Sequence, residues 1–191
     1  MTETLASAPL EILEKNVVYR EQGGAEFAVT KVLVQSIKVR NRFTVHYASV
    51  QDGRLGAVCV TVHKNRLLMA RHWRVATESW EWEFPRGMGA SDESIEQTAL
   101  RELHEETGMH TSPDSVTLLQ YMHADTGVLK DSIGVVSLTL EDKTPDEYQD
   151  WELSDCTWVT PERIEQMIAG GEIVDGITIA AYTIWRVQSK S

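Results

Sequence analysis

Three glutamates, Glu102, Glu105 and Glu106, have the spacing of side chains that act together. On an α-helix, residues three and four apart share a face, so these carboxylates would converge and repel by about a few tenths of a kcal/mol per pair. A solvated acidic face is the simplest explanation, yet residues 87–109 contain no lysine and only one arginine, Arg101, to relieve the repulsion. The carboxylates also lie toward the C-terminal half, where the helix dipole disfavours anions. Both penalties favour a site for a hard divalent cation, which takes oxygen ligands.

The local sequence predicts the helix that positions these glutamates. Ser91 is an expected N-cap, with acidic residues directly after it in the first turn. Gly108 supplies the expected left-handed stop. The apolar residues at a spacing of four predict one buried stripe, which consists of Ile95, Ala99 and Leu103.

Residues 87–109 resemble the signature of the Nudix family, G-x5-E-x7-R-E-U-x-E-E-x-G-U, in which U is apolar. All nine fixed positions are filled, by Gly87, Glu93, Arg101, Glu102, Leu103, Glu105, Glu106, Gly108 and Met109. The resemblance implies that the three glutamates bind metal, with Mg²⁺ as the cofactor and Mn²⁺ as a substitute. It also implies a structural ion pair between Arg101 and Glu93, which joins the loop to the helix.

Two further segments resemble the ADP-ribose pyrophosphatase branch of that family. Residues 81–87 are similar to its E-L-P-A-G run, which implies metal binding by the carbonyl of Arg86 and a substrate-binding role for Glu83. Residues 171–175 resemble its G-x-I-x-D segment. There are departures: Arg86 replaces a small residue, and the step at Thr126-Gly127 lacks the usual proline. GDP-mannose, another nucleoside diphosphate sugar or a nucleoside triphosphate therefore stays open as the substrate.

A base that activates water is expected outside the helix. In related pyrophosphatases a late loop carries an E-x-E pair, and the resemblance aligns it with Asp150 and Glu152. We expect Asp150 to accept the proton and Glu152 to bind an additional metal ion. A solvated acidic loop is the alternative explanation, and Asp131, otherwise a substrate-binding candidate, is a rival base.

Two arginines at the end of the strand before the signature, Arg71 and Arg74, are candidates for contact with phosphate or ribose. Surface placement is the alternative for both residues.

The elements around the helix predict an α/β (α+β) fold with a mixed sheet, which the resemblance identifies as the Nudix α/β/α sandwich. Residues 1–14 are expected to be a loose or partly helical lead-in, and residues 16–50 to be rich in strands. Further strands are expected at 57–62, 66–70, 116–121, 133–140 and 156–159, and two helices at 161–169 and 175–187. We divide the chain into an N-terminal β extension (1–50), which the resemblance makes a dimerisation element, and a hydrolase domain (51–191).

Composition limits the partners. A net charge of -11 disfavours nucleic-acid binding, whereas an acidic protein can act on a small-molecule nucleoside diphosphate through a bridging metal ion. Cys59 and Cys156 are expected to be buried, reduced thiols. We find neither a signal peptide nor a segment of about 20 apolar residues, so a cytoplasmic location is expected. The family resemblance implies a homodimer.

Two alternative functions remain. A non-catalytic nucleotide-sugar sensor is disfavoured by the intact signature and by the absence of a helix-turn-helix module. An isomerase of the same fold would need a catalytic cysteine with an acid partner, which neither cysteine has by sequence.

Overall fold

The computed structural model describes residues 8–21, 27–50, 55–141 and 153–189. The chain divides into two compact units. The first contains residues 1–53 together with 125–131, and the second contains residues 54–124 and 132–191. The segment 125–131 therefore packs with the N-terminal region although it follows the signature helix by about 20 residues.

The first unit is an antiparallel sheet of strands β1 (Leu10–Arg20), β2 (Phe27–Ser36) and β3 (Arg42–Val50), in that order. The predicted lead-in is wrong from Leu10 onward, because these residues pair with β2, Leu10 lying opposite Ser36. Pairing with a β-branched strand overrides the weak helical preference of the Leu-Glu sequence there. Segment 125–131 joins this sheet because the N–H of Ala48 donates to the carbonyl of Val128 at 2.8 Å, and the carbonyl of Ala48 accepts from Lys130 N–H at 2.8 Å.

The second unit is built on a mixed sheet in the described part of the chain. Its path runs β10 (Leu153–Val159), β5 (Arg66–Arg74), β4 (Gly56–His63), β9 (Ile133–Thr139) and β8 (Val116–Met122). Short strands β6 (Ser79–Glu83) and β7 (Arg86–Met88) pair with β5 and β4 respectively. Strands β4 and β9 are parallel, and the other pairs are antiparallel.

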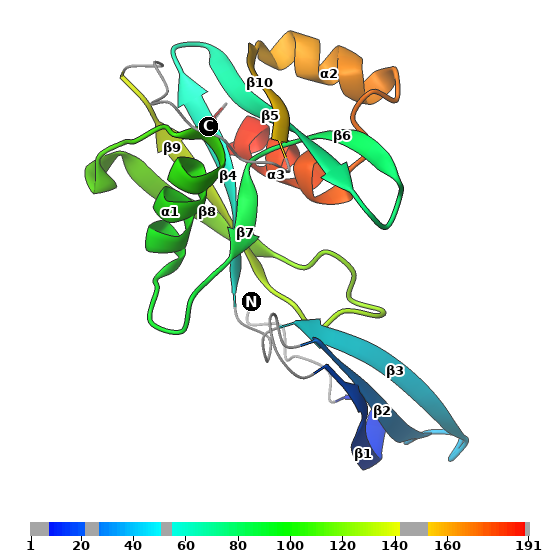
Figure 1. Ribbon diagram of the computed structural model, residues 1–191. Helices are drawn as coiled ribbons and strands as arrows, with labels where there is room; N and C mark the ends of the chain where they lie inside the picture. The colour runs from blue at the N-terminus through cyan, green and yellow to red at the C-terminus, as the bar shows by residue number, and fades with distance from the viewer. Residues whose placement is uncertain (1–7, 22–26, 51–54, 142–152, 190–191) are drawn as a thin grey trace, which may run out of the picture. The chain divides into compact units, whose positions relative to one another are not determined.

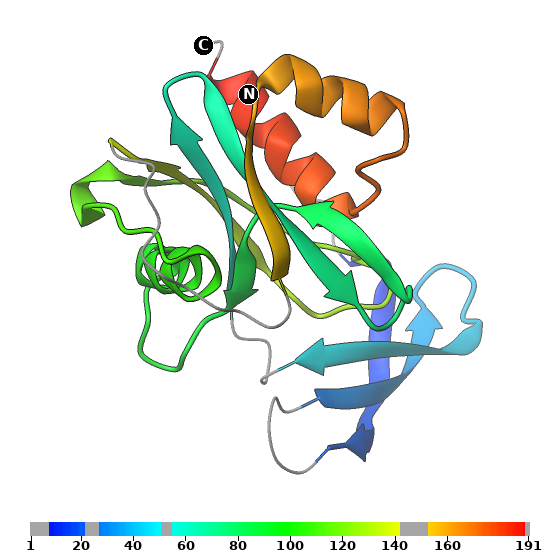
Figure 2. The same ribbon diagram turned by 45° about the horizontal axis from the view of Figure 1, so that its top comes forward.

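Helices cover both faces of this sheet, as Figures 1 and 2 show. Helix α1 (Ile95–Thr107) lies on one face, and α2 (Pro161–Ala169) and α3 (Gly176–Gln188) lie on the other. One buried apolar cluster forms under α1 and includes Leu68 and Leu103, whereas the other forms under α2 and α3 and includes Met69 and Ile164. The alternation of Leu68 and Met69 is the period of two expected of a strand between two layers. The predicted α/β/α sandwich with a mixed sheet is confirmed.

Two local predictions need correction. Helix α1 is capped by Ser94, not Ser91, because Ser94 and Gln97 form a reciprocal capping box in which each side chain accepts from the other's backbone N–H. The C-terminal prediction is confirmed, with Gly108 at φ 67°. Cys59 is buried as expected, but Cys156 is exposed, on β10 at the edge of the sheet.

No helix among the described residues is both long enough and apolar enough to cross a membrane.

Candidate active site

The site begins where strand β7 passes under helix α1. Gly87 on β7 lies so close to the carboxylate of Glu102 that a Cβ added to the glycine would fall 2.1 Å from Glu102 Cδ. Any side chain at residue 87 would therefore displace a carboxylate that is itself buried. On its other edge β7 pairs with β4, with Ala57 opposite Gly87. The glycine of the signature is thus required by this close approach and not by a positive φ.

Arg101 joins the loop before α1 to the helix. Its guanidinium binds Glu93 through Nε at 2.8 Å and Nη2 at 3.0 Å, and it donates to the carbonyl of Met88 at 2.8 Å. The ion pair implied by the resemblance is present. Sequence reasoning missed a second set of contacts: Nη1 lies 2.7 Å from Glu102 Oε1 and 2.6 Å from Glu105 Oε2. Arg101 therefore contacts two of the three clustered glutamates as well as its structural partner.

The surroundings of Glu93 and Glu102 shift the pKa values of these two carboxyl groups in opposite directions. The hydrogen bond from Arg101, with one from the backbone of Ala90, lowers the pKa of Glu93 to about 2. The same ion pairs raise the pKa of Arg101. Burial raises the pKa of Glu102 despite the hydrogen bond from Arg101, and the like charges of Glu106 and Glu105 raise it further. Glu102 therefore has less positive charge around it than an ionised, buried carboxylate needs.

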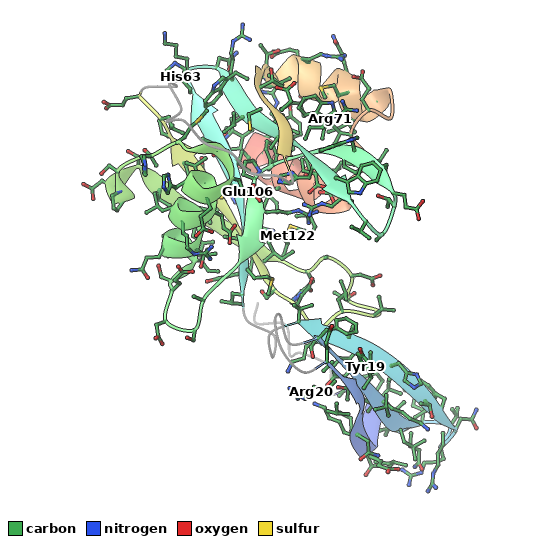
Figure 3. All side chains as sticks on the ribbon, viewed as in Figure 1. Tyr19, Arg20, His63, Arg71, Glu106 and Met122 are labelled. Atoms are coloured by element: carbon green, nitrogen blue, oxygen red, sulfur yellow. The ribbon has the colours of Figure 1, made fainter. Side chains whose placement is uncertain are left out.

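Glu106 faces the sheet from the last turns of α1, and Figure 3 shows it between the helix and the strands. Its Oε2 accepts a hydrogen bond from the backbone N–H of Arg86 at 3.2 Å. Its Oε1 lies 3.3 Å from Nε2 of His72, a residue of β5 that is 2% exposed. Sequence reasoning missed His72. The alternation of side chains along the strand could have indicated it, because His72 lies on the same α1-facing side of β5 as Leu68 and Ala70.

A buried ion network lies beside this group. Glu83 is 1% exposed and accepts from Arg74 Nε at 2.8 Å and from Arg86 Nη2 at 2.7 Å. Arg86 also reaches Asp175 at 3.2 Å, and Asp175 caps helix α3 by accepting from Thr178 N–H at 2.8 Å. Burial alone would raise the pKa of Glu83, but the hydrogen bond from Arg74 and the charges of both arginines lower it. The network ties β5, β6 and β7 to α3.

The two candidate substrate arginines are separated by the strand. Arg74 lies on the same side as Glu83, and a third of its side chain is exposed. Arg71 is exposed, and its guanidinium lies 5.8 Å from the ring of Trp82, which packs against the core cluster under α2 and α3. The structure therefore brings Arg74, Arg86 and Glu83 together with the box glutamates, and places Arg71 over the opposite layer (Figure 3).

Asp150 is the base expected from the sequence, with Glu152 beside it and Asp131 as a rival. Asp150 and Glu152 lie outside the described residues. The strand that follows them, β10, begins at Leu153, which pairs with His72 on β5. Asp131 is half-buried and belongs to the first unit.

The donor chemistry of this group fits a divalent cation. Carboxylate oxygens from α1 and an imidazole nitrogen from β5 are ligand types that divalent ions take. Within the described ranges, no three His, Cys, Asp or Glu side chains lie close enough together to hold a metal ion. The guanidinium of Arg101 lies between Glu102 and Glu105 and supplies positive charge there. Each of these two carboxylates gives one oxygen to Arg101, which leaves its second oxygen for a cation.

Comparisons with known proteins agree with the signature. The family model of the NUDIX domain matches residues 53–179, about two thirds of the chain. A solved structure described as an ADP compounds hydrolase superposes with a TM-score of 0.79 over 98% of this chain and 97% of its own, at 18% sequence identity. At that identity the likeness shows the shared fold. No curated protein is significantly similar in sequence to the chain.

Proposed function

This chain belongs to the Nudix family and is a pyrophosphohydrolase of that family, and we propose that it hydrolyses the diphosphate linkage of a nucleoside diphosphate sugar of the ADP-ribose type. The products would be a nucleoside monophosphate and a sugar phosphate, which for ADP-ribose are AMP and ribose 5-phosphate. The observation that carries the proposal is the group formed by the α1 glutamates, Glu83 and the two arginines that flank it. The similar fold of an ADP compounds hydrolase supports the choice of nucleotide.

Nudix enzymes use divalent metal ions, and we propose Mg²⁺ here, with Mn²⁺ as a substitute, held by Glu102, Glu105, Glu106 and the carbonyl of Arg86. When bound, the ions would neutralise the diphosphate and polarise its oxygens. Gly87 lets Glu102 approach β7 closely, so its carboxylate is held where the chain turns into the helix.

The arginines act beside the metal site. Arg74 keeps a third of its side chain exposed while Glu83 holds its Nε edge, so the remaining guanidinium surface can meet a phosphate or ribose hydroxyl. Glu83 would contribute by orienting Arg74 and Arg86, since both guanidinium groups bind its carboxylate. Arg71 remains a candidate for the second half of the substrate, from the other side of the strand.

For the base, we propose Asp150, with Glu152 as an additional metal ligand. The support is positional, because the strand after them pairs with His72, the neighbour of Glu106. A proton taken from the attacking water by Asp150 would contribute about 10²–10⁴-fold. We expect Asp150→Asn and Glu152→Gln each to lower kcat far more than they raise KM, and Asp131→Asn to do much less. If Asp131→Asn lowered kcat severely and the other two variants lowered it only mildly, Asp131 would be the base.

The N-terminal extension is proposed as a dimerisation element of a cytoplasmic enzyme. In the described residues, β1 carries several large apolar side chains on its exposed surface, among them Ile12 and Val18, at 65% and 54% exposed. Such a strand at a sheet edge readily pairs with another chain.

The deciding experiment is a panel of ADP-ribose, GDP-mannose, other nucleoside diphosphate sugars and nucleoside triphosphates, with products identified by mass spectrometry. Cleavage of ADP-ribose to AMP in the presence of Mg²⁺ is expected. A matched pair of variants tests the site: Glu106→Gln should lose about a hundredfold or more in kcat, because an amide is a poor metal ligand. Glu96→Gln, on the first turn of the same helix, should leave kcat unchanged.

Other outcomes assign other functions. Release of pyrophosphate from triphosphates alone would make the chain a nucleoside triphosphate pyrophosphohydrolase, and cleavage of GDP-mannose alone would change the nucleoside. Tight binding of a nucleotide sugar without cleavage, unaffected by Glu106→Gln, would make it a sensor.

A further inference from the structure

His72 is an exception to the way buried polar groups are usually satisfied. It is 2% exposed, and neither of its ring nitrogens has a hydrogen-bond partner within the part of the chain that the structure describes. Most buried polar side chains are hydrogen-bonded, so each exception calls for an explanation. The other buried histidine of the second unit, His63, follows the rule, because its Nδ1 lies 2.9 Å from the carbonyl of Leu140.

A carboxylate that we propose as a metal ligand lies close to His72. Its Nε2 lies 3.3 Å from Oε1 of Glu106, without the alignment of a hydrogen bond. The other oxygen of Glu106 accepts from the backbone N–H of Arg86. Two neighbouring ligands of an octahedral cation, each about 2.1 Å from the ion, lie about 3 Å apart. The separation of Nε2 and Oε1 is therefore that of two atoms able to share one cation.

Two other buried polar side chains of the second unit, Glu83 and Cys59, are bound by groups other than His72. The buried carboxylate on the adjoining strand, Glu83, is bound by Arg74 and Arg86 and has no need of an imidazole donor. The thiol of Cys59, buried on β4, donates to the carbonyl of Ala99 at 3.3 Å. His72 therefore has no ion pair with Glu83, and the carboxylate that it faces is that of Glu106.

We propose that Nε2 of His72 is a ligand of the cation bound by Glu106, and that this nitrogen makes the position prefer a transition-metal ion over Mg²⁺. Imidazole nitrogen binds first-row transition metals well, with affinity rising from Mn²⁺ to Co²⁺, whereas Mg²⁺ takes oxygen ligands. The inference rests on the proposed function in taking Glu106 as a metal ligand. The further metal positions, whose proposed ligands are all oxygen atoms, keep their preference for Mg²⁺.

Pulsed electron paramagnetic resonance of the full-length protein loaded with Mn²⁺ tests the ligand directly. The wild type is expected to show a coupling between the metal and a ring nitrogen, which changes when the protein contains ¹⁵N-labelled histidine. His72→Gln should abolish the coupling. His104→Gln is the control, because His104 is exposed on α1 and stacks on His110 at 3.9 Å between ring centroids, a pair that could bind metal adventitiously. That variant should keep the coupling.

Calorimetric titration with Co²⁺ and Mg²⁺ tests the preference. His72→Gln should weaken Co²⁺ binding by about tenfold or more and Mg²⁺ binding by less than about threefold. Equal losses for both ions without a nitrogen coupling would overturn the proposal, because they would make His72 a hydrogen-bonding support of Glu106. Absence of the coupling in the folded wild type would overturn it without any variant.

Glu106→Gln separates this inference from the proposed function. If Glu106→Gln loses metal binding and hydrolysis while His72→Gln binds Co²⁺ normally, only the role of His72 is wrong. If Glu106→Gln retains both, the metal role of the helix glutamates is wrong as well.

Discussion

Neutralising Glu83 should reveal how much the buried ion network stabilises the fold. In Glu83→Gln, two guanidinium groups lose their shared carboxylate, while Arg86 keeps its contact with Asp175 at 3.2 Å. Breaking a buried ion pair by removing one partner typically costs about 3–5 kcal/mol. Because Arg74 is a third exposed and can be solvated, we expect the lower end, about 3 kcal/mol. For a chain of this size that lowers Tm by about 6–12 °C.

A matched control uses an ion pair of the same chemistry at the surface. Glu172 also binds an arginine through both carboxylate oxygens, Arg163 at 2.8 and 3.0 Å, but both side chains are nearly half exposed. Glu172→Gln should therefore cost about 1 kcal/mol or less. Thermal and urea unfolding of both variants, followed by circular dichroism, gives the comparison. Equal losses from the two variants would refute the argument that burial makes the Glu83 network costly to break.

The pH dependence supplies an independent check. The pKa of Glu83 is lower in the folded protein than its ordinary value of 4.5. Its ionised form therefore stabilises the fold fully above that ordinary value, and the stabilisation is lost as the pH falls through the lower, folded-state pKa. The difference in unfolding free energy between wild type and Glu83→Gln should be constant near neutrality and shrink in acid. A difference that grows in acid would contradict the assigned direction.

Three further perturbations address the remaining parts. Arg101→Ala should lower Tm, because it strands Glu93, and the loss should diminish as the pH falls toward the Glu93 pKa of about 2; an unchanged Tm with collapsed turnover would contradict the structural role of Arg101. Gly87→Ala should displace the Glu102 carboxylate and lower kcat by about tenfold or more, with a smaller effect on Tm. Wild-type kinetics would show that β7 shifts to make room for the added methyl group without loss of activity. The native particle should run near 43 kDa, twice the 21.5 kDa chain, in gel filtration with light scattering. Deleting residues 1–50 should cause aggregation, because segment 125–131 then loses its backbone partners on β3; an active, well-behaved truncated monomer would remove the basis for this expectation.

Much of the site was predictable because its features are local. The face shared by Glu102, Glu105 and Glu106 follows from helical geometry alone, and so does the buried stripe under them. The stop at Gly108 follows from the ease with which glycine adopts a positive φ, here 67°. The start of the helix was misplaced by three residues, because two serines compete for the cap and Ser94 alone has a glutamine three residues later.

Features that depend on distant pairing were not predictable. Residues 10–14 form a strand because β2 lies beside them and pairs with them. Cys156 is exposed on β10, which is the edge strand next to β5. Segment 125–131 was assigned to the hydrolase domain, yet its backbone bonds are to β3. Each of these outcomes requires knowing which strands become neighbours.

The sequence by itself determined the family, the helix and the set of clustered carboxylates, since all three follow from residues 87–109 and the carboxylates share one face of a single helix. Only the tertiary structure decided what surrounds those carboxylates. His72 meets Glu106 across 34 residues of chain, and Arg86 meets Asp175 across 89. No local pattern relates such residues, because the register of the sheet and the packing of helices on its faces bring them together.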